Sequence, residues 1–271
     1  MKRQRGFSLI EMMVAVAIFV IITGAAFSLL DTSQRRYTSE AQLLDSFQAA
    51  RFGYDQMSLD IHSAGFPPQN AFTAGLTAAN ANLVTQTPFA WSPGYVFGAA
   101  GAPCTVGATC LTPGPFDLII EAAIPNAVAG GCPGAGPIGP GAAPVPVVWI
   151  RYQLAGTTLS RAAVCKGPGD PAAATLAALT PYVDNVINNI PPTQMAPIQG
   201  EYPGMFPGNN PIPLFTYFGG STCVAPAPII PGCIKEVEIN MIVQSPSNDQ
   251  TTGRPRVTNL TGQVIRFNPA Q

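Results

Sequence analysis

The chain begins with the stretch Met1-Lys-Arg-Gln-Arg-Gly6-Phe-Ser-Leu-Ile-Glu11, and an apolar run without any charged residue extends from there to Leu30. Three basic residues precede Gly6, and the only ionisable side chain between Gly6 and Asp31 is that of Glu11. As a helix with a rise of about 1.5 Å per residue, the uncharged run of about 19 residues would match the hydrocarbon thickness of a bilayer. The beginning of the chain therefore predicts a helix of membrane-spanning length.

Glu11 is unusual because it places a carboxylate just inside this apolar segment. Such a residue costs roughly 3 kcal/mol on membrane-insertion scales, and it usually has a partner and a function. The basic residues Lys2, Arg3 and Arg5 hold the N-terminus in the cytoplasm by the positive-inside rule, so the rest of the chain faces outward. A positive group on a neighbouring molecule would neutralise Glu11 inside a bundle of apolar helices.

The string from Arg5 to Glu11 resembles the type IV prepilin processing signal, which pilins share with the pseudopilins of type II secretion systems. This resemblance implies that a prepilin peptidase cleaves between Gly6 and Phe7 and then methylates the new amino group of Phe7. Glu11 matches the glutamate at the fifth mature position of the family. The ammonium group of Phe7 in a neighbouring subunit would then be its partner. Glycine before the cut suits this processing, because it has no side chain to obstruct a protease.

Three other interpretations of the same residues remain open. Ser8 and Glu11 fit a capping box, in which Glu11 only closes the start of a helix. The run also fits an ordinary secretory signal cut near Ala25 or Ala26, although a carboxylate at the entrance of the hydrophobic region argues against that interpretation. A plain single-pass membrane anchor is the third.

The composition indicates an exported domain and excludes an electrostatic nucleic-acid binder. The 271 residues allow one large or two ordinary domains. The net charge is −1 and only 10% of the residues are charged, so there is no basic surface for nucleic acid. All six cysteines follow the apolar run, which suits an oxidising compartment.

The predicted helix continues beyond the apolar run. No proline occurs between Asp31 and Ile61, and apolar residues recur at alternating spacings of four and three, as on one face of an amphipathic helix: Leu43, Phe47, Ala50, Tyr54, Met57 and Ile61. Charged residues, Asp60 among them, are assigned to the solvent side. The combined helix of about 55 residues would be about 80 Å long, and Gly65, Pro67 and Pro68 would end it. Residues 49–66 resemble the corresponding helix end of PilW-like minor pilins and J-type minor pseudopilins.

Alternating apolar residues predict strands in the rest of the chain. The strongest signal is a hairpin of residues 147–154 and 157–164 around Ala155-Gly156, with Val148, Ile150, Tyr152 and Leu154 on one face. Its pattern Tyr-x-Leu-x-Gly-x-x-Leu-x-Arg, from Tyr152 to Arg161, again resembles PilW-like minor pilins and J-type pseudopilins. Further strands are predicted at residues 117–123, 213–218, 234–243 and 262–267.

We therefore predict an α+β, type IV pilin-like fold, in which a long N-terminal helix precedes one mainly antiparallel β-sheet domain with long Gly/Pro-rich loops. The predicted divisions are a leader (1–6), the transmembrane or assembly half of the helix (7–30), its amphipathic half (31–64) and a disulfide-containing globular domain (65–271). Glycine and proline make up about a fifth of the chain, as loops of this length require.

Six cysteines allow many connectivities. The hypothesis favoured by spacing is two local disulfides, Cys104–Cys110 and Cys223–Cys233, with Cys132–Cys165 as the residual pair. Each bridge would close a loop of low apolar content and contribute about 2–3 kcal/mol.

The sequence predicts no enzyme, cofactor or metal site. His62 is the only histidine, and a lone histidine at a helix end is usually a favourable charge or a packing residue. The acid pairs Glu236/Glu238 and Asp117/Glu121 could suggest general acid–base chemistry or calcium binding. Alternation on a strand, however, places Glu236 and Glu238 on one exposed face, where a solvated edge is the usual explanation. The cysteine spacings lack a tight metal-binding pattern.

What the resemblance implies is a minor pilin of the PilW type that helps to prime or build a type IV pilus. The expected partners are other minor and major pilins, the prepilin peptidase, the inner-membrane assembly platform and the membrane itself. The expected location is the bacterial inner membrane with a periplasmic domain, and then the extracellular pilus. One alternative is a J-type minor pseudopilin of a type II secretion system. The other is a membrane-tethered adhesin or binding domain that does not polymerise.

Overall fold

The structure is a computed structural model, which describes residues 8–68, 83–85, 87–89, 113–128, 132, 147–166, 179–219, 234–249 and 253–267. The chain divides into two compact units. One comprises Met1–Asp45 with Ser245–Arg256, and the other comprises Ser46–Gln244 with Val257–Gln271.

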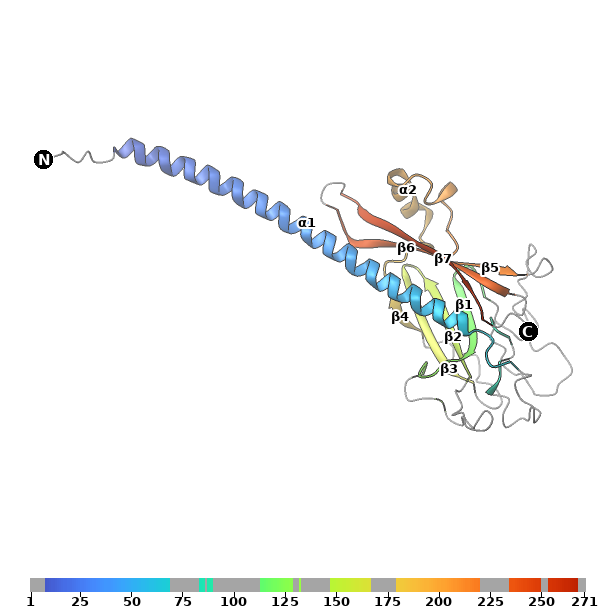
Figure 1. Cartoon of the computed structure of the whole chain (residues 1–271). Helices are drawn as coiled ribbons and strands as arrows, with labels where there is room; N and C mark the ends of the chain where they lie inside the picture. Colours follow the sequence, from blue (N-terminus) through green and yellow to red (C-terminus); the bar gives the residue numbers. More distant parts are fainter. Residues whose placement is uncertain are drawn as a thin grey trace. The chain divides into compact units, whose positions relative to one another are not determined.

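A single long helix, α1 (Leu9–Ser63), contains 55 residues and is drawn as one continuous coil from blue to cyan in Figure 1. It begins at Leu9, and the backbone N–H groups of Glu11 and Met12 both donate to the carbonyl of Ser8, at 3.1 and 3.2 Å. One 18-residue window of α1 has a mean hydropathy of 2.6, which makes the helix long and apolar enough to cross a membrane.

The first sheet contains four antiparallel strands in the order β1 (Asp117–Ala123), β2 (Val147–Ala155), β3 (Thr158–Cys165) and β4 (Thr180–Val183). The hairpin of β2 and β3 turns at Gly156, whose φ of +60° lies in the left-handed region that glycine adopts without strain. In its register Tyr152 lies opposite Arg161, and Leu154 lies opposite Leu159.

The second sheet contains β5 (Phe215–Gly219), β6 (Ile234–Asn248) and β7 (Pro255–Ile265), with β6 in the middle. Strands β5 and β6 are antiparallel. A short helix, α2 (Pro192–Glu201), and a 3-10 turn, η4 (Pro207–Asn209), lie in the sequence between the two sheets.

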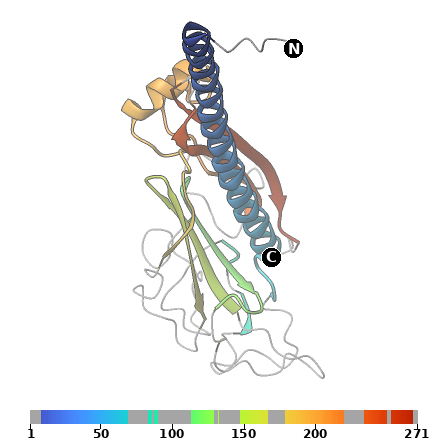
Figure 2. The same cartoon turned by 90° about the vertical axis from the view of Figure 1, so that its left-hand side faces the viewer.

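The C-terminal part of α1 packs on both sheets in one hydrophobic core. Met57 and Ile61 are fully buried there with Ile120 of β1 and Ile239 of β6. Fully burying such a side chain contributes about 1.5–3 kcal/mol, so this face fixes the helix to the sheets. The end of α1 also lies beside the C-terminal red strand in Figure 2, where the backbone N–H of Phe267 donates to the carbonyl of His62 at 3.1 Å.

The predicted fold class is confirmed, because a long apolar N-terminal helix precedes antiparallel β-structure. The sheet is divided in two, however, and the strand predicted at 262–267 begins at Pro255. Neither β4 nor α2 is among the elements predicted from the sequence. Both contain an internal proline, Pro181 or Pro197, which weakens the local signal for a strand or a helix.

Candidate functional site

The predicted processing site lies at the extreme N-terminus, just before α1. Gly6 and Phe7 fall outside the described residues, whereas Glu11 lies in the first turn of α1 and is exposed. Within the part of the chain that the structure describes, the Glu11 carboxylate forms no ion pair. Any partner for this charge in an apolar environment would have to come from the chain terminus or from another molecule.

The helix segment after Glu11 exposes its apolar side chains on all sides. The large apolar side chains from Leu9 to Leu30 are between 52% and 79% exposed. The hydroxyl of Thr23 donates to the carbonyl of Phe19 at 2.7 Å, so this polar group is satisfied by its own helix. A helix that is apolar all round needs lipid or other helices around it. The segment is therefore built for a membrane or a helix bundle.

A second polar site lies at the other end of α1, around Asp60. We had assigned Asp60 to the solvent side of the helix, and this was wrong because its side chain is only 1% exposed. The hydroxyl of Tyr152 donates to Oδ2 of Asp60 at 2.6 Å, and Nη2 of Arg161 lies 3.2 Å from the same oxygen. Nε2 of Gln56 donates to Oδ1 at 2.9 Å. We call these four residues the Asp60 cluster.

The Asp60 cluster joins the helix end to the β2–β3 hairpin. Tyr152 and Arg161 lie opposite each other in that hairpin, and Nε of Arg161 donates to the hydroxyl of Tyr152 at 3.0 Å. Burial raises the pKa of Tyr152 well above its usual range, and the charge of Asp60 raises it further, so the hydroxyl stays a donor. Because the carboxylate of Asp60 is paired with Arg161 and the Tyr152 hydroxyl stays protonated, the cluster joins the helix to the hairpin.

The sequence contained a signal for two of the four residues of the Asp60 cluster. Tyr152 and Arg161 are the two polar residues of the hairpin pattern that resembles PilW-like proteins, and the sequence places Tyr152 on the same face as apolar residues of its strand. A buried tyrosine hydroxyl needs a hydrogen-bond partner. The partner could have been sought among acids on the buried side of α1, three or four residues from Met57.

The acid pair Asp117/Glu121 does not form a catalytic dyad, since each carboxylate has its own cation. Asp117 accepts a hydrogen bond from Nε of Arg151 at 2.9 Å. Glu121 is buried, with Oε1 2.5 Å from Nζ of Lys166, and its other oxygen accepts from the backbone N–H of Thr87 at 3.1 Å. A buried pair satisfied in this way fixes neighbouring segments together.

The remaining polar residues singled out in the sequence have structural surroundings. Glu236 and Glu238 are half-buried on β6, opposite Phe218 and Thr216 of β5. The ring of His62 lies 4.9 Å from that of Phe267. Within the described residues, no group of three histidine, cysteine or acidic side chains could hold a metal ion.

Two side-chain nitrogen atoms of one buried arginine lack a hydrogen-bond partner among the described residues. Arg266, which directly follows β7, is 1% exposed, and neither its Nε nor its Nη1 has a hydrogen-bond partner among the described residues. Burial lowers its pKa from the usual value.

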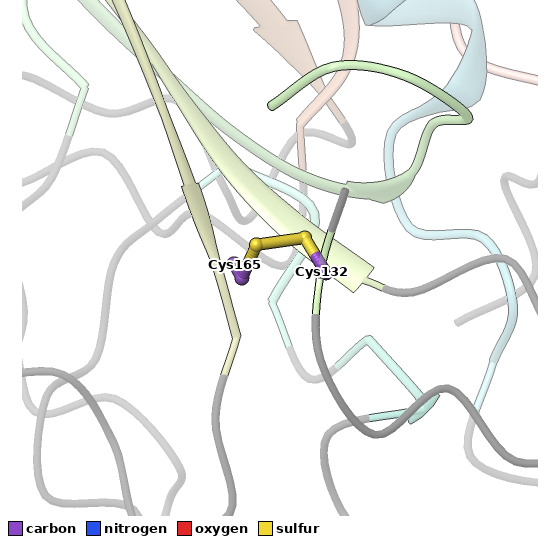
Figure 3. Close-up of a disulfide and its surroundings, with 2 residues drawn as sticks. All are labelled: Cys132 and Cys165. Atoms are coloured by element: carbon purple, nitrogen blue, oxygen red, sulfur yellow. A yellow bond between two sulfur atoms is a disulfide. The ribbon is translucent and has the colours of Figure 1, made fainter. Parts of the chain in front are cut away.

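A disulfide joins Cys132 to Cys165, the last residue of β3, with a Cα–Cα distance of 5.5 Å (Figure 3). The bridge spans 33 positions of the sequence, and closing a loop of this length stabilises a fold by about 3–4 kcal/mol on the chain-entropy account. The other two proposed disulfides, Cys104–Cys110 and Cys223–Cys233, fall on residues outside the described part.

Comparison with known proteins identifies the N-terminal segment. A family model described as the prokaryotic N-terminal methylation motif matches residues 1–27, a segment that contains Gly6, Phe7, Glu11 and most of the apolar run. Comparisons with curated proteins and with solved structures found no significant match. The motif belongs to structural proteins rather than to catalysts, and it implies processing by a prepilin peptidase and assembly with other pilins in general. The chain therefore carries a type IV pilin-like prepilin signal in front of a helix suited to anchoring in a membrane.

Proposed function

We propose that this protein is a minor pilin of a type IV pilus, similar to the PilW type. The observation that carries the proposal is the combination of the methylation motif at residues 1–27 with the exposed apolar surface of α1, which begins beside a Glu11 that has no ion pair among the described residues. A soluble or merely tethered domain has no use for a carboxylate at that position, whereas a polymer can supply its counter-charge.

The proposed sequence of events begins in the inner membrane. Residues 1–6 form the leader, and the prepilin peptidase cuts between Gly6 and Phe7 and methylates the amino group of Phe7. Residues 7–30 hold the subunit in the bilayer, with residues 31–64 and the domain 65–271 in the periplasm. The assembly platform then extracts the subunit into the extracellular pilus.

Extraction exchanges one apolar environment for another. Lipid around the segment Leu9–Leu30 is replaced by the helices of major and minor pilins, so little apolar surface is exposed to water. The Phe7 ammonium group of a neighbouring subunit meets Glu11 in this bundle, where the low dielectric strengthens their attraction.

A second candidate is a J-type minor pseudopilin of a type II secretion system. It is supported by the hairpin pattern from Tyr152 to Arg161, which resembles both families. The two candidate functions are distinguished by the assembly in which the protein is found. A minor pilin is recovered in sheared pili, whereas a pseudopilin is required for secretion of exoproteins.

Mass spectrometry of the mature N-terminus tests the proposal directly. We expect the purified chain to begin with N-methylated Phe7, and any other N-terminus would refute pilin-type processing.

A second experiment tests polymerisation. Glu11→Gln should strongly reduce the amount of protein in sheared pili, whereas Glu40→Gln, the same change at an exposed position of α1, should leave it unchanged. Equal incorporation of both variants would favour a tethered adhesin or binding domain that does not polymerise.

A further inference from the structure

We propose that a cleft beside the Asp60 cluster binds a small cyclic carboxylate, such as a hexuronic acid or an aromatic acid. The cleft lies between α1, the segment after β1, and strands β3 and β4, and its volume is about 330 Å³. Six of its lining residues carry the argument: Phe52, Gln56, Pro125, Asn126, Arg161 and Tyr182. A cavity of this size is in the range of small-ligand sites, and the inference goes beyond assembly of a pilus.

Two aromatic rings form the apolar wall of the cleft. Phe52 of α1 is 66% exposed, and its ring centroid lies 6.3 Å from that of Tyr182 of β4. The two ring planes are tilted by 48° to each other. The exposed ring of Phe52 and the half-buried ring of Tyr182 offer flat surfaces on which the apolar face of a sugar ring or an aromatic ring can stack.

Arg161 supplies a fork of N–H groups for a carboxylate. Its Nε and one Nη2 hydrogen face inward, to Tyr152 and Asp60. These two donors lie on the same edge of the planar guanidinium, and the other edge, formed by Nη1 and the second Nη2 hydrogen, makes no hydrogen bond among the described residues. This edge presents two parallel donors, which is the geometry that binds a carboxylate in a bidentate manner. The side chain is 19% exposed and lines the cleft.

Two amide side chains complete the polar part of the cleft. Gln56 uses its Nε2 for Asp60, which leaves Oε1 as an acceptor. Asn126 is exposed, and its φ of +59° is a left-handed conformation that asparagine tolerates. Its side-chain amide offers both a donor and an acceptor. A ligand with hydroxyl groups needs this mixture of donors and acceptors.

The three features together define the ligand class. The aromatic wall requires a flat apolar face, the Arg161 edge requires a carboxylate, and the volume is larger than a single acidic side chain fills. A hexuronic acid satisfies all three, and an aromatic acid satisfies them without using the amides. For a ligand of about 13 non-hydrogen atoms, ordinary binding efficiency gives a Kd on the order of 1 mM.

The test is a titration of the purified full-length chain in non-ionic micelles by saturation-transfer NMR, with glucuronate, benzoate and glucose as probes. We expect glucuronate to bind about tenfold more tightly than glucose, because glucose lacks the carboxylate. Binding of benzoate alone would support the proposal with an aromatic acid as the ligand. Equal binding of glucuronate and glucose, or saturable binding of none of the probes, would overturn it.

Three variants locate the binding in the cleft. Phe52→Ala should abolish measurable binding, and Arg161→Lys should reduce the affinity for the acids about tenfold, because lysine keeps the charge beside Asp60 but lacks the fork. Leu59→Ala is the matched control, since Leu59 is 62% exposed on the same helix but does not line the cleft. Thermal unfolding of each variant shows whether a loss of binding is only a loss of folding. A photo-crosslinker at position 52 that captures another pilin in cells would overturn the small-ligand assignment and make the cleft a contact between subunits.

Discussion

The helix α1 contains two acids, Asp60 and Glu11, that differ in burial and in ion pairing. The comparison separates an acid that is paired within the folded domain from one that is not. Asp60, near the C-terminal end of the helix, is 1% exposed and receives three hydrogen bonds from Gln56, Tyr152 and Arg161. Glu11, in the first turn, is exposed and has no ion-pair partner in the described part of the chain. The domain thus supplies a counter-charge for Asp60, whereas none is found for Glu11 among the described residues.

The largest expected effect is at Asp60. Asp60→Ala should lower the free energy of unfolding by about 3–5 kcal/mol, because it leaves the buried Tyr152 and the half-buried Arg161 without their partner. Urea unfolding of the full chain in micelles measures this change. Asp55→Ala, on the exposed side of the same helix, should change it by less than about 0.5 kcal/mol. Equal effects of the two substitutions would mean that the cluster contributes nothing beyond an ordinary surface acid.

Tyr152→Phe should have the next largest effect, about 1.5–3 kcal/mol, because the hydroxyl donates to a charged acceptor. The pH dependence has a definite sign. Burial raises the pKa of Tyr152 above its usual value of 10.0, so its contribution is fully present below that pH and is lost as the pH rises further.

Unfolding free energies measured between neutral pH and strongly alkaline pH check this sign. We expect a decline for the wild type only above the usual tyrosine pKa, and a smaller decline for Tyr152→Phe. Burial also raises the pKa of Tyr217, so some alkaline decline should persist in this variant. An unchanged slope would show that Tyr152 does not titrate with unfolding.

Arg266 contrasts with Asp60, because two nitrogen atoms of this buried cation lack a hydrogen-bond partner among the described residues. Arg266→Met should raise the free energy of unfolding by about 1 kcal/mol, because an apolar side chain of similar length avoids the cost of burying these two polar groups. The same urea titration measures it. A clear loss of stability would show that the guanidinium has a partner in the folded protein.

Local patterns were enough to predict α1 and the β2–β3 hairpin, because the period of apolar residues, 3.6 for a helix and 2 for a strand, can be recognised within a short stretch of sequence. The position of Asp60 could not be predicted in this way. Its partners Tyr152 and Arg161 are 92 and 101 residues away in the sequence, so a helical wheel shows only an acid beside the apolar stripe. The strand β4 was missed for a different reason, since it has four residues and contains Pro181.

The candidate processing site was the reverse case. The motif around Gly6 and Glu11 is contiguous, so the sequence alone pointed to it and the family match covers the same residues. Its chemistry requires a peptidase, a membrane and other subunits. Within the described residues Glu11 has no ion-pair partner, so the structure adds little there beyond the start of the helix.

The smallest expected effect on stability, that of Glu11→Gln, completes the comparison. Because Glu11 has no ion pair within the described residues, neutralising it should change the unfolding free energy of the monomeric chain in micelles by less than about 0.5 kcal/mol. The same substitution should nevertheless strongly reduce incorporation into pili, since its charge acts only in the assembled bundle. Asp60→Ala should show the opposite order, with unfolding as the primary defect. If Glu11→Gln instead destabilised the monomer by several kcal/mol, the glutamate would serve the fold of its own chain, and the contrast between the two acids would be lost.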